Sequence, residues 1–117
     1  MRVILLSLLL LNAAHVFAAC PPPLKPVSNP RQAQEVAQSA IQECRLSRLP
    51  PACVRLFVQS APAFWLVDVR EQHDAQCGGD PDTAPRLFSL QIWRDGRVLS
   101  DAASMDGSFL PLTRAAS

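Results

Sequence analysis

The side chains that could do chemistry gather between residues 71 and 86, in a segment rich in carboxylates that also holds one histidine and one cysteine. Cys77, with His73 four residues before it, has the composition of a thiol and base pair. A catalytic thiol must stay reduced, whereas three other cysteines compete for Cys77 in a chain that we expect to be exported. A Gly-x-Ser-x-Gly motif is absent and His73 is the only histidine after residue 18, so no serine triad is indicated. We therefore predict that the protein is not an enzyme.

The acidic residues of the same segment raise the question of a metal site. Their oxygens suit calcium, yet Asp80-Pro81-Asp82 lacks the spacing of a complete calcium loop. Aspartates in such turns commonly cap their own backbone. A zinc site at His73 would need a third ligand that the sequence does not indicate. We predict no metal and no cofactor, and we expect Arg86 to pair with Asp80 or Asp82 and brace the loop.

Two predicted strands flank this loop and must hold its ends. Residues 64–70 are aromatic and β-branched, and in residues 86–94 apolar and polar side chains alternate as in a half-buried strand. The loop between them is far longer than the two to five residues of a hairpin turn, and such loops commonly carry function. Asp95-Gly96 then favours a tight turn that pairs residues 97–100 with the preceding strand. Alternation over residues 52–59 predicts a further strand.

A helix is predicted before the strands. Asn29 is a favourable cap, Pro30 fits the first helical position and Gln32 completes the capping pattern. The apolar residues that follow recur at spacings of three and four, as in a one-sided helix of about four turns. They are Ala33, Val36, Ala37, Ala40, Ile41 and Cys44. The order of elements predicts an α+β fold, in which one N-terminal helix packs on a small antiparallel sheet of three to four strands stapled by disulfides.

The chain begins with an export signal, residues 1–18, in which a charged residue precedes an apolar run. Val16-x-Ala18 fits cleavage by a signal peptidase, which would release a chain that starts at Ala19. The rival interpretation is a lipid anchor at Cys20, because Phe17-Ala18-Ala19-Cys20 resembles the lipobox of bacterial lipoproteins. We therefore predict a periplasmic or secreted protein without a transmembrane span after cleavage, with lipid anchoring as the alternative.

One small domain follows the signal. Residues 19–29 are rich in proline, which predicts an extended linker, and residues 30–117 form a single α+β domain. Four cysteines in an oxidising compartment allow three fully paired connectivities, so we expect two disulfides. The formal charge is only +1, with both signs mixed along the chain, so no basic face is available for nucleic acid. We predict no nucleic-acid partner.

The strand predicted over residues 64–70 has apolar side chains on both faces, because successive residues of a strand point to opposite sides. One set must therefore lie outside the core that the helix covers. Either the C-terminal tail packs on that set, or it forms a partner-binding surface. The side chains on one face are Trp65, Val67 and Val69, and those on the other are Phe64 and Leu66.

The sequence around the loop reads Val67-x-Val69-Arg70-Glu71-x-His73 and then Cys77-Gly78-Gly79-Asp80-Pro81-x-Thr83-x-Pro85-Arg86-Leu87-Phe88. Over residues 50–102 this pattern resembles a group of small exported bacterial proteins of uncharacterised function. The resemblance implies an exported helix-plus-sheet domain in which Cys53 is bridged to Cys77, and it implies no activity. Cys20 and Cys44 would then form the second pair, unless Cys20 is lipidated and Cys44 is left over. Pairing of Cys44 with Cys53 is the open alternative.

These observations lead to one functional hypothesis. The chain is expected to be a small periplasmic, non-enzymatic protein that binds a protein partner in the cell envelope, as an inhibitor or an immunity-type protein does. A disulfide would hold loop 73–86 rigid, and a rigid loop binds at a lower entropic cost. The alternatives are a small-ligand or metal-binding envelope module and a structural lipoprotein. The predicted contact residues are His73, Asp74, Asp80, Asp82, Thr83 and Arg86.

Overall fold

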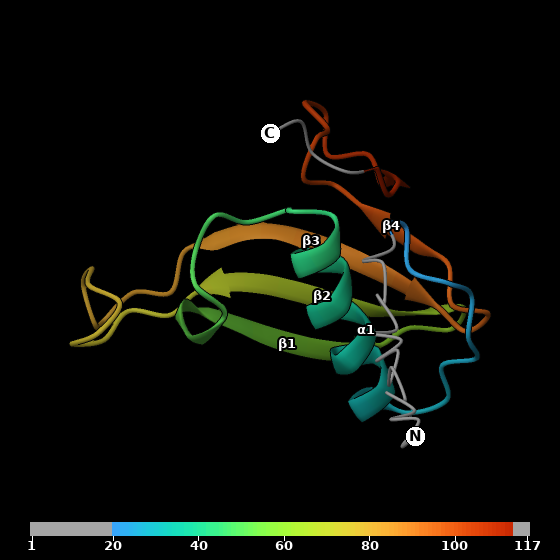
Figure 1. Cartoon of the computed structure of the whole chain (residues 1–117), viewed down its shortest axis with the longest axis horizontal. Helices are drawn as coiled ribbons and strands as arrows, with labels where there is room; N and C mark the ends of the chain where they lie inside the picture. The colour runs from blue at the N-terminus through green and yellow to red at the C-terminus, as the bar shows by residue number, and fades with distance from the viewer. Residues whose placement is uncertain (1–19, 114–117) are drawn as a thin grey trace, which may run out of the picture.

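The structure is a computed structural model that describes residues 20–113. The predicted signal peptide, residues 1–18, lies outside the described residues. Within residues 20–113, a single α-helix lies across one face of a five-stranded antiparallel sheet whose strands follow one another in sequence order (Figure 1). The elements are α1 (Pro30–Glu43), the short 3-10 helix η1 (Pro51–Cys53), β1 (Val54–Ser60), β2 (Phe64–Glu71), β3 (Arg86–Trp93), β4 (Val98–Ser100) and β5 (Leu110–Pro111).

The α+β architecture is confirmed, but the prediction of three to four strands is wrong because the tail adds a fifth. Strand β5 is only two residues long and pairs with Leu99 and Ser100 of β4. A strand this short has no alternation to detect, and its proline is a residue that strands generally lack. It forms only because β4 offers an unpaired edge beside it, which is a tertiary effect.

Helix α1 starts where its capping residues predict. The Asn29 side chain accepts a hydrogen bond from the Gln32 amide at 2.9 Å, and Pro30 occupies the first helical position. The Gln32 side chain accepts from the Ser28 amide at 2.8 Å, one residue before the cap rather than at the cap itself. The face toward the sheet is fully buried and made of alanines, whose small size lets the helix backbone approach the strands. These alanines are Ala33, Ala37 and Ala40.

The core lies between α1 and the helix-facing side of the sheet. In the strand register, Val67 of β2 lies opposite Val58 of β1 and Leu90 of β3. Val69, two residues farther along β2, belongs to the next row of paired residues on the same face. Of the two apolar sets on β2, the one that begins at Trp65 is therefore in the core. The set that begins at Phe64 faces away from α1, on a side of the sheet that we call the open face.

The C-terminal tail joins the sheet at its β4 edge. Leu112 is buried in the core, and its amide donates to the Val98 carbonyl at 3.3 Å. Phe57, on β1 at the opposite edge, keeps 41% of its surface exposed. The part of the open face on β1 therefore stays accessible.

The proline-rich segment is extended and lies against the domain. Val27 is only 2% exposed, and its amide donates to the Arg94 carbonyl at 2.9 Å. A Cβ atom on Gly96 would come within 2.5 Å of the Lys25 backbone, so the hairpin tip needs glycine where this segment crosses it. Residues 20–29 therefore contribute to the core and also lead into α1.

Two disulfides form, Cys20–Cys44 and Cys53–Cys77. Cys53–Cys77 is the pair that the resemblance implied, Cys20–Cys44 is the pair that then remained, and the alternative of Cys44 with Cys53 is not formed. The first bond ties the proline-rich segment to the end of α1, and the second ties the long loop to η1. Within residues 20–113, no helix has the length and apolar character needed to cross a membrane.

Candidate functional site

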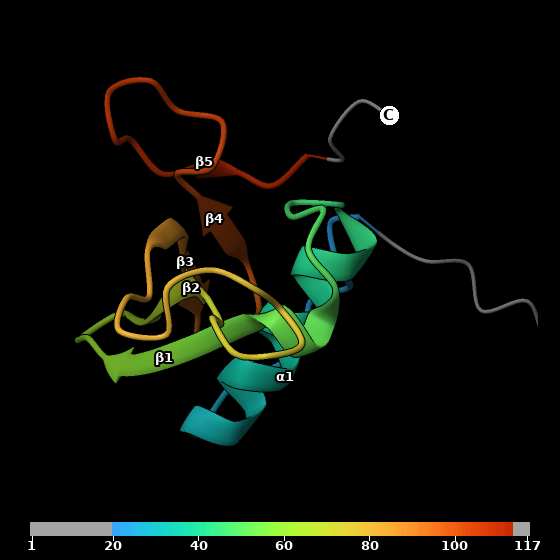
Figure 2. The same ribbon diagram turned by 90° about the vertical axis from the view of Figure 1, so that its left-hand side faces the viewer.

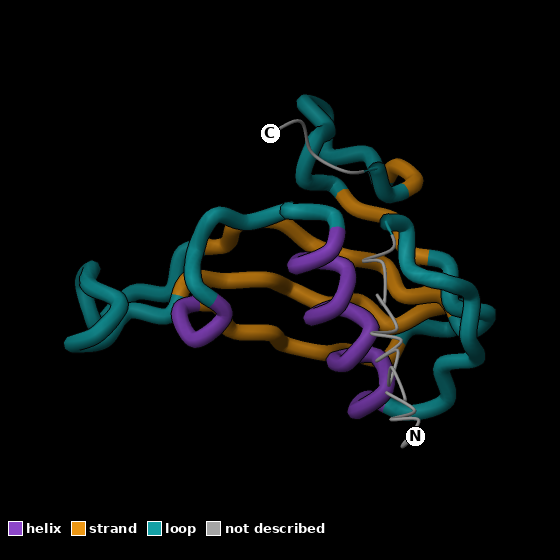
Figure 3. The backbone as a smooth tube through the Cα atoms, in the orientation of Figure 1, coloured by secondary structure: helices purple, strands orange, loops and turns teal. Residues whose placement is uncertain are grey.

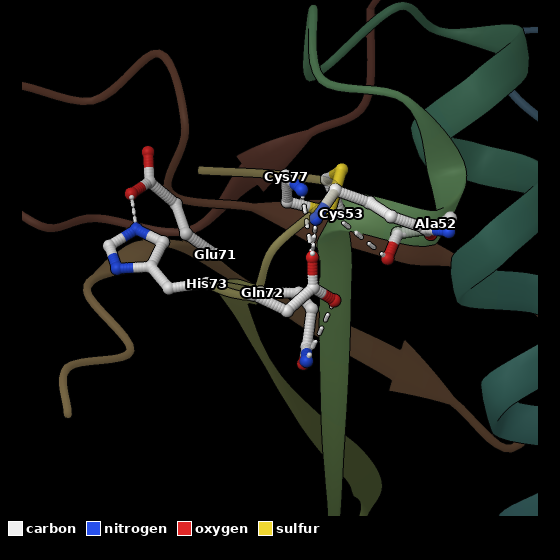
Figure 4. Close-up of a disulfide and its surroundings, with 8 residues drawn as sticks. Ala52, Cys53, Glu71, Gln72, His73 and Cys77 are labelled. Atoms are coloured by element: carbon white, nitrogen blue, oxygen red, sulfur yellow. Dashed lines mark hydrogen bonds and ion pairs between the residues drawn. A yellow bond between two sulfur atoms is a disulfide. The ribbon is translucent and has the colours of Figure 1, made fainter. Parts of the chain in front are cut away.

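The long connection between β2 and β3 projects from one end of the sheet, beyond η1 (Figures 1 and 3). Its two ends are held together, since the Glu71 amide donates to the Pro85 carbonyl at 2.9 Å. Its first half is attached to η1, where the Gln72 amide donates to the Cys53 carbonyl at 2.7 Å and Cys53 is bonded to Cys77 (Figure 4). The loop therefore leaves the sheet from a fixed base.

Asp74 organises the first half of the loop. Its carboxylate accepts hydrogen bonds from the Gln76 amide at 2.9 Å and the Cys77 amide at 2.7 Å. Its carbonyl accepts from the Gly78 amide at 2.9 Å and closes the turn. The Cys77 amide, followed by that of Gln76, stabilises the charged carboxylate and lowers the pKa of Asp74. Asp74 thus acts as a turn cap next to the disulfide.

Asp80 organises the second half in the same way. Its carboxylate accepts from the Asp82 amide at 2.9 Å. Its carbonyl accepts from the Thr83 amide at 3.1 Å and from the Thr83 hydroxyl at 3.1 Å. Both aspartates therefore cap turns, and for Asp80 this is the role that its turn sequence predicted.

His73 joins the two halves and connects them to β2. Its Nε2 lies 2.7 Å from a carboxylate oxygen of Glu71 (Figure 4). Its Nδ1 lies 2.8 Å from the Asp80 carbonyl oxygen and 3.1 Å from the Thr83 hydroxyl. The carboxylate of Glu71, and then the carbonyl of Asp80, raise the pKa of His73. Only the imidazolium can donate from both nitrogens at once, so protonation strengthens this bridge.

Gly79 leaves room for the His73 ring. A Cβ atom at this position would lie 2.7 Å from three ring atoms, closer than any real contact of that kind. The neighbouring Gly78 has a similar φ of +77°, compared with +81° for Gly79, but a Cβ there would meet nothing within 4 Å. Both glycines allow the left-handed backbone, but only at Gly79 is the absence of a side chain also needed to make room for the His73 ring.

The prediction that Arg86 pairs with Asp80 or Asp82 is wrong. Its guanidinium forms an ion pair with Asp101 and donates to the Ser89 hydroxyl at 3.1 Å. Arg86 is the first residue of β3, so its side chain follows the sheet toward the connection after β4 instead of turning back into the loop.

Arg70 braces the loop in place of Arg86. One nitrogen of its guanidinium donates to the Ala84 carbonyl at 3.0 Å, and another lies 3.6 Å from the Asp68 carboxylate. The sequence did not indicate this role of Arg70, because its acceptor in the loop is a backbone carbonyl, a group present at every position.

Asp82 is the predicted contact residue whose carboxylate has no role in the loop. It is exposed beside the Asp80 turn, and its carboxylate makes no hydrogen bond or ion pair with residues 20–113. Between Glu71 and Pro85 the chain has four carboxylates and neither lysine nor arginine. The loop therefore presents an acidic surface with one carboxylate fully available at its exposed turn.

The loop offers neither a nucleophilic thiol nor a cluster of metal ligands. Cys77 is disulfide-bonded, and no group of three or more His, Cys, Asp or Glu side chains within residues 20–113 is placed to hold a metal ion. No family model, curated protein or solved structure matches this chain. The resemblance to small exported bacterial proteins stays a prediction.

Proposed function

We propose that this chain is an extracytoplasmic, non-enzymatic binding protein that contacts a protein partner through loop 73–86. The observation that carries the proposal is that a disulfide and hydrogen bonds within the chain itself hold the loop, from which we infer that it is rigid before any partner arrives. The disulfide at Cys77, the turn caps of Asp74 and Asp80 and the bridge of His73 hold its backbone. A loop held in this way loses little conformational entropy on binding, so more of its contact energy becomes affinity.

The charge of the loop supports a particular kind of partner. Residues 71–85 hold four carboxylates and neither lysine nor arginine, and this charge favours a basic surface, which would be drawn to the loop by long-range attraction. We assign the direct charge contact to Asp82, because the other aspartates and His73 are engaged in holding the loop. An inhibitor or immunity-type protein that covers a basic cleft has this chemistry.

The compartment is part of the same proposal. Two disulfides and the predicted export signal support a periplasmic or secreted location, where such bonds persist. The bond between Cys20 and Cys44 uses the sulfur atom that a lipid anchor at Cys20 would need. The disulfide-bonded form and the lipidated form therefore exclude each other, and we propose the disulfide-bonded form.

The test compares two variants that change the net charge equally. Asp82→Lys reverses the charge of the available carboxylate in the loop. Glu35→Lys reverses the charge of an exposed carboxylate on α1, far from the loop in the sequence. Each immobilised protein would be incubated with an envelope extract, and the proteins retained would be quantified by mass spectrometry at low and high salt. We expect wild type and Glu35→Lys to retain the same basic protein, and Asp82→Lys to retain at least about tenfold less.

The salt dependence provides the second criterion. Retention by the wild type should fall as salt increases, because screening weakens exposed charge contacts. Equal retention by Asp82→Lys and wild type would exclude the loop as the contact element. Equal loss in both variants would show that only net charge matters and would exclude it as well.

A further inference from the structure

The two edges of the sheet are built differently. At one edge, β5 is two residues long and contains Pro111, which has no amide hydrogen to offer a new strand. At the other edge, β1 runs for seven residues without proline, its pairing with β2 is regular, and its only charged residue is Arg55. Exposed edges normally carry charges, bulges or prolines that prevent pairing. The β1 edge has almost none of these.

The hydrogen bonds at both ends of β1 show which of its backbone groups face outward. The Gln72 amide donates to the Cys53 carbonyl, and the Ala61 amide donates to the Phe64 carbonyl. In an antiparallel pair such bonded positions alternate, so the odd-numbered residues from 53 to 61 bond to β2. The amides and carbonyls of Val54, Leu56 and Val58 therefore point to the unpaired edge.

The side chains of two of these residues, Val54 and Leu56, face a groove between β1 and α1. The groove has a volume of about 250 Å³, enough for one or two apolar side chains. Its lining comes from the second half of α1, from the segment after it and from β1, and none of the lining residues is charged. They are Gln38, Ile41, Gln42, Ser47, Leu49, Pro51, Val54 and Leu56.

We propose that the β1 edge and this groove bind an extended segment of a partner protein as a sixth strand. The backbone of the segment would bond to the outward groups of Val54, Leu56 and Val58, as in strand addition. One or two side chains on the helix-facing side of the segment would enter the groove. Because the lining is uncharged, these side chains must be uncharged, since a charge here would lose its water without finding a counterion, and the mainly apolar lining favours apolar ones.

The shape of the molecule favours a single strand over a second copy of the chain. Both ribbon views place the first turns of α1 beyond the β1 edge (Figures 1 and 2). Two copies paired through β1 about a two-fold axis normal to the sheet would carry both helices on the same face. Each protruding helix would then meet the partner's edge, whereas an isolated strand brings no helix. This site is separate from loop 73–86 and does not depend on the function proposed for that loop.

The probe is a displayed library of random peptides of about nine residues, selected against the disulfide-bonded protein. A synthetic copy of the selected peptide is then added to the isotope-labelled protein, and amide exchange is followed by NMR. In the free protein we expect slow exchange at Arg55, Phe57 and Gln59 and fast exchange at the outward-facing amides of Val54, Leu56 and Val58. On peptide binding, the three outward-facing amides should become protected.

Two pairs of variants test the edge and the groove. Val58→Pro removes an outward amide hydrogen and no bond to β2, while its control Val58→Thr keeps the amide. Gln42→Glu adds a charge to the groove, while its control Gln34→Glu adds the same charge on another exposed position of α1. We expect Val58→Pro and Gln42→Glu each to weaken peptide binding by about tenfold or more and the controls to change it little.

Three results would overturn the proposal. The first is that no peptide is enriched, or that the enriched peptides bind both test variants as they bind the wild type. The second is that the free protein is a dimer in which the outward amides of β1 are already protected, which would assign the edge to a second copy. The third is that Asp82→Lys abolishes peptide binding, which would place the peptide on the loop.

Discussion

At the level of single residues, most of the side chains expected to contact a partner shape the loop itself. Asp74 and Asp80 cap turns, and His73 contacts both β2 and the second turn through its two ring nitrogens. Asp82 alone among these aspartates keeps its carboxylate available. The residue types in the loop were informative, but their roles depend on which backbone groups come within reach.

His73 makes the stability of the loop depend on pH. The folded loop raises the pKa of His73 above its ordinary value of 6.5, so the stabilisation is complete below about pH 6.5 and is lost as the pH rises through the raised pKa. We expect the difference in melting temperature between wild type and His73→Gln to be largest near pH 5 and small near pH 9. A difference that grew with pH would contradict this assignment.

The two glycines provide a matched control for the His73 bridge. Gly79→Ala and Gly78→Ala introduce the same left-handed backbone strain, and only the first places a Cβ atom 2.7 Å from the His73 ring. NMR titration should therefore show the pKa of His73 returning toward 6.5 in Gly79→Ala and staying raised in Gly78→Ala. The same pKa in both variants would mean that the ring does not depend on this space.

At the level of elements, the alanine face of α1 sets how close the helix lies to the sheet. Ala33, Ala37 and Ala40 are fully buried, so there is no space between the helix and the sheet for larger side chains at these positions. Their spacing was visible in the sequence, and their partners on β2 and β3 were not. The alanine spacing is therefore a local property of α1, whereas the distance between the helix and the sheet is set by packing against the strands.

Ala37→Leu should destabilise the protein by about 1 to 3 kcal/mol, because three additional carbons must be forced between α1 and the sheet. Gln34→Leu, at an exposed position of the same helix, should change stability by less than about 0.5 kcal/mol. Urea denaturation monitored by circular dichroism measures both. A small effect of Ala37→Leu would mean that the helix can shift outward easily.

At the level of the whole molecule, two disulfides with equal sequence separations of 24 residues compensate for a small core. One holds the proline-rich segment, including buried Val27, against the domain, and the other holds the loop at η1. The two bonds lie in different parts of the molecule, because Cys44 belongs to the core and Cys77 lies in the projecting loop. The two bonds should therefore affect different parts of the molecule.

Replacing Cys20 and Cys44 together by serine should lower the free energy of unfolding by about 2 to 4 kcal/mol, measured by urea denaturation without reductant. Replacing Cys53 and Cys77 together should, in addition to any loss of stability, accelerate amide exchange in residues 72–79 more than in β2 and β3. Uniform acceleration across the sheet and loop in the second variant would show that the loop and the core unfold as one unit.

The features that depend on near neighbours followed from the sequence: the Asn29 cap, the alternation along β2 and β3, the Asp95-Gly96 turn and the aspartate caps. Each involves groups a few residues apart, so local patterns contain the necessary information. The predicted α+β class follows from the order of these elements.

Only the tertiary structure decided which distant groups meet. Arg70 reaches the Ala84 carbonyl, Arg86 reaches Asp101, and Val27 bonds to the backbone of Arg94. The fifth strand and the choice of which face of β2 lies in the core have the same origin. Folding brings together backbone groups that every residue possesses, and their selection depends on distance in space, which the spacing of residue types along the chain does not record.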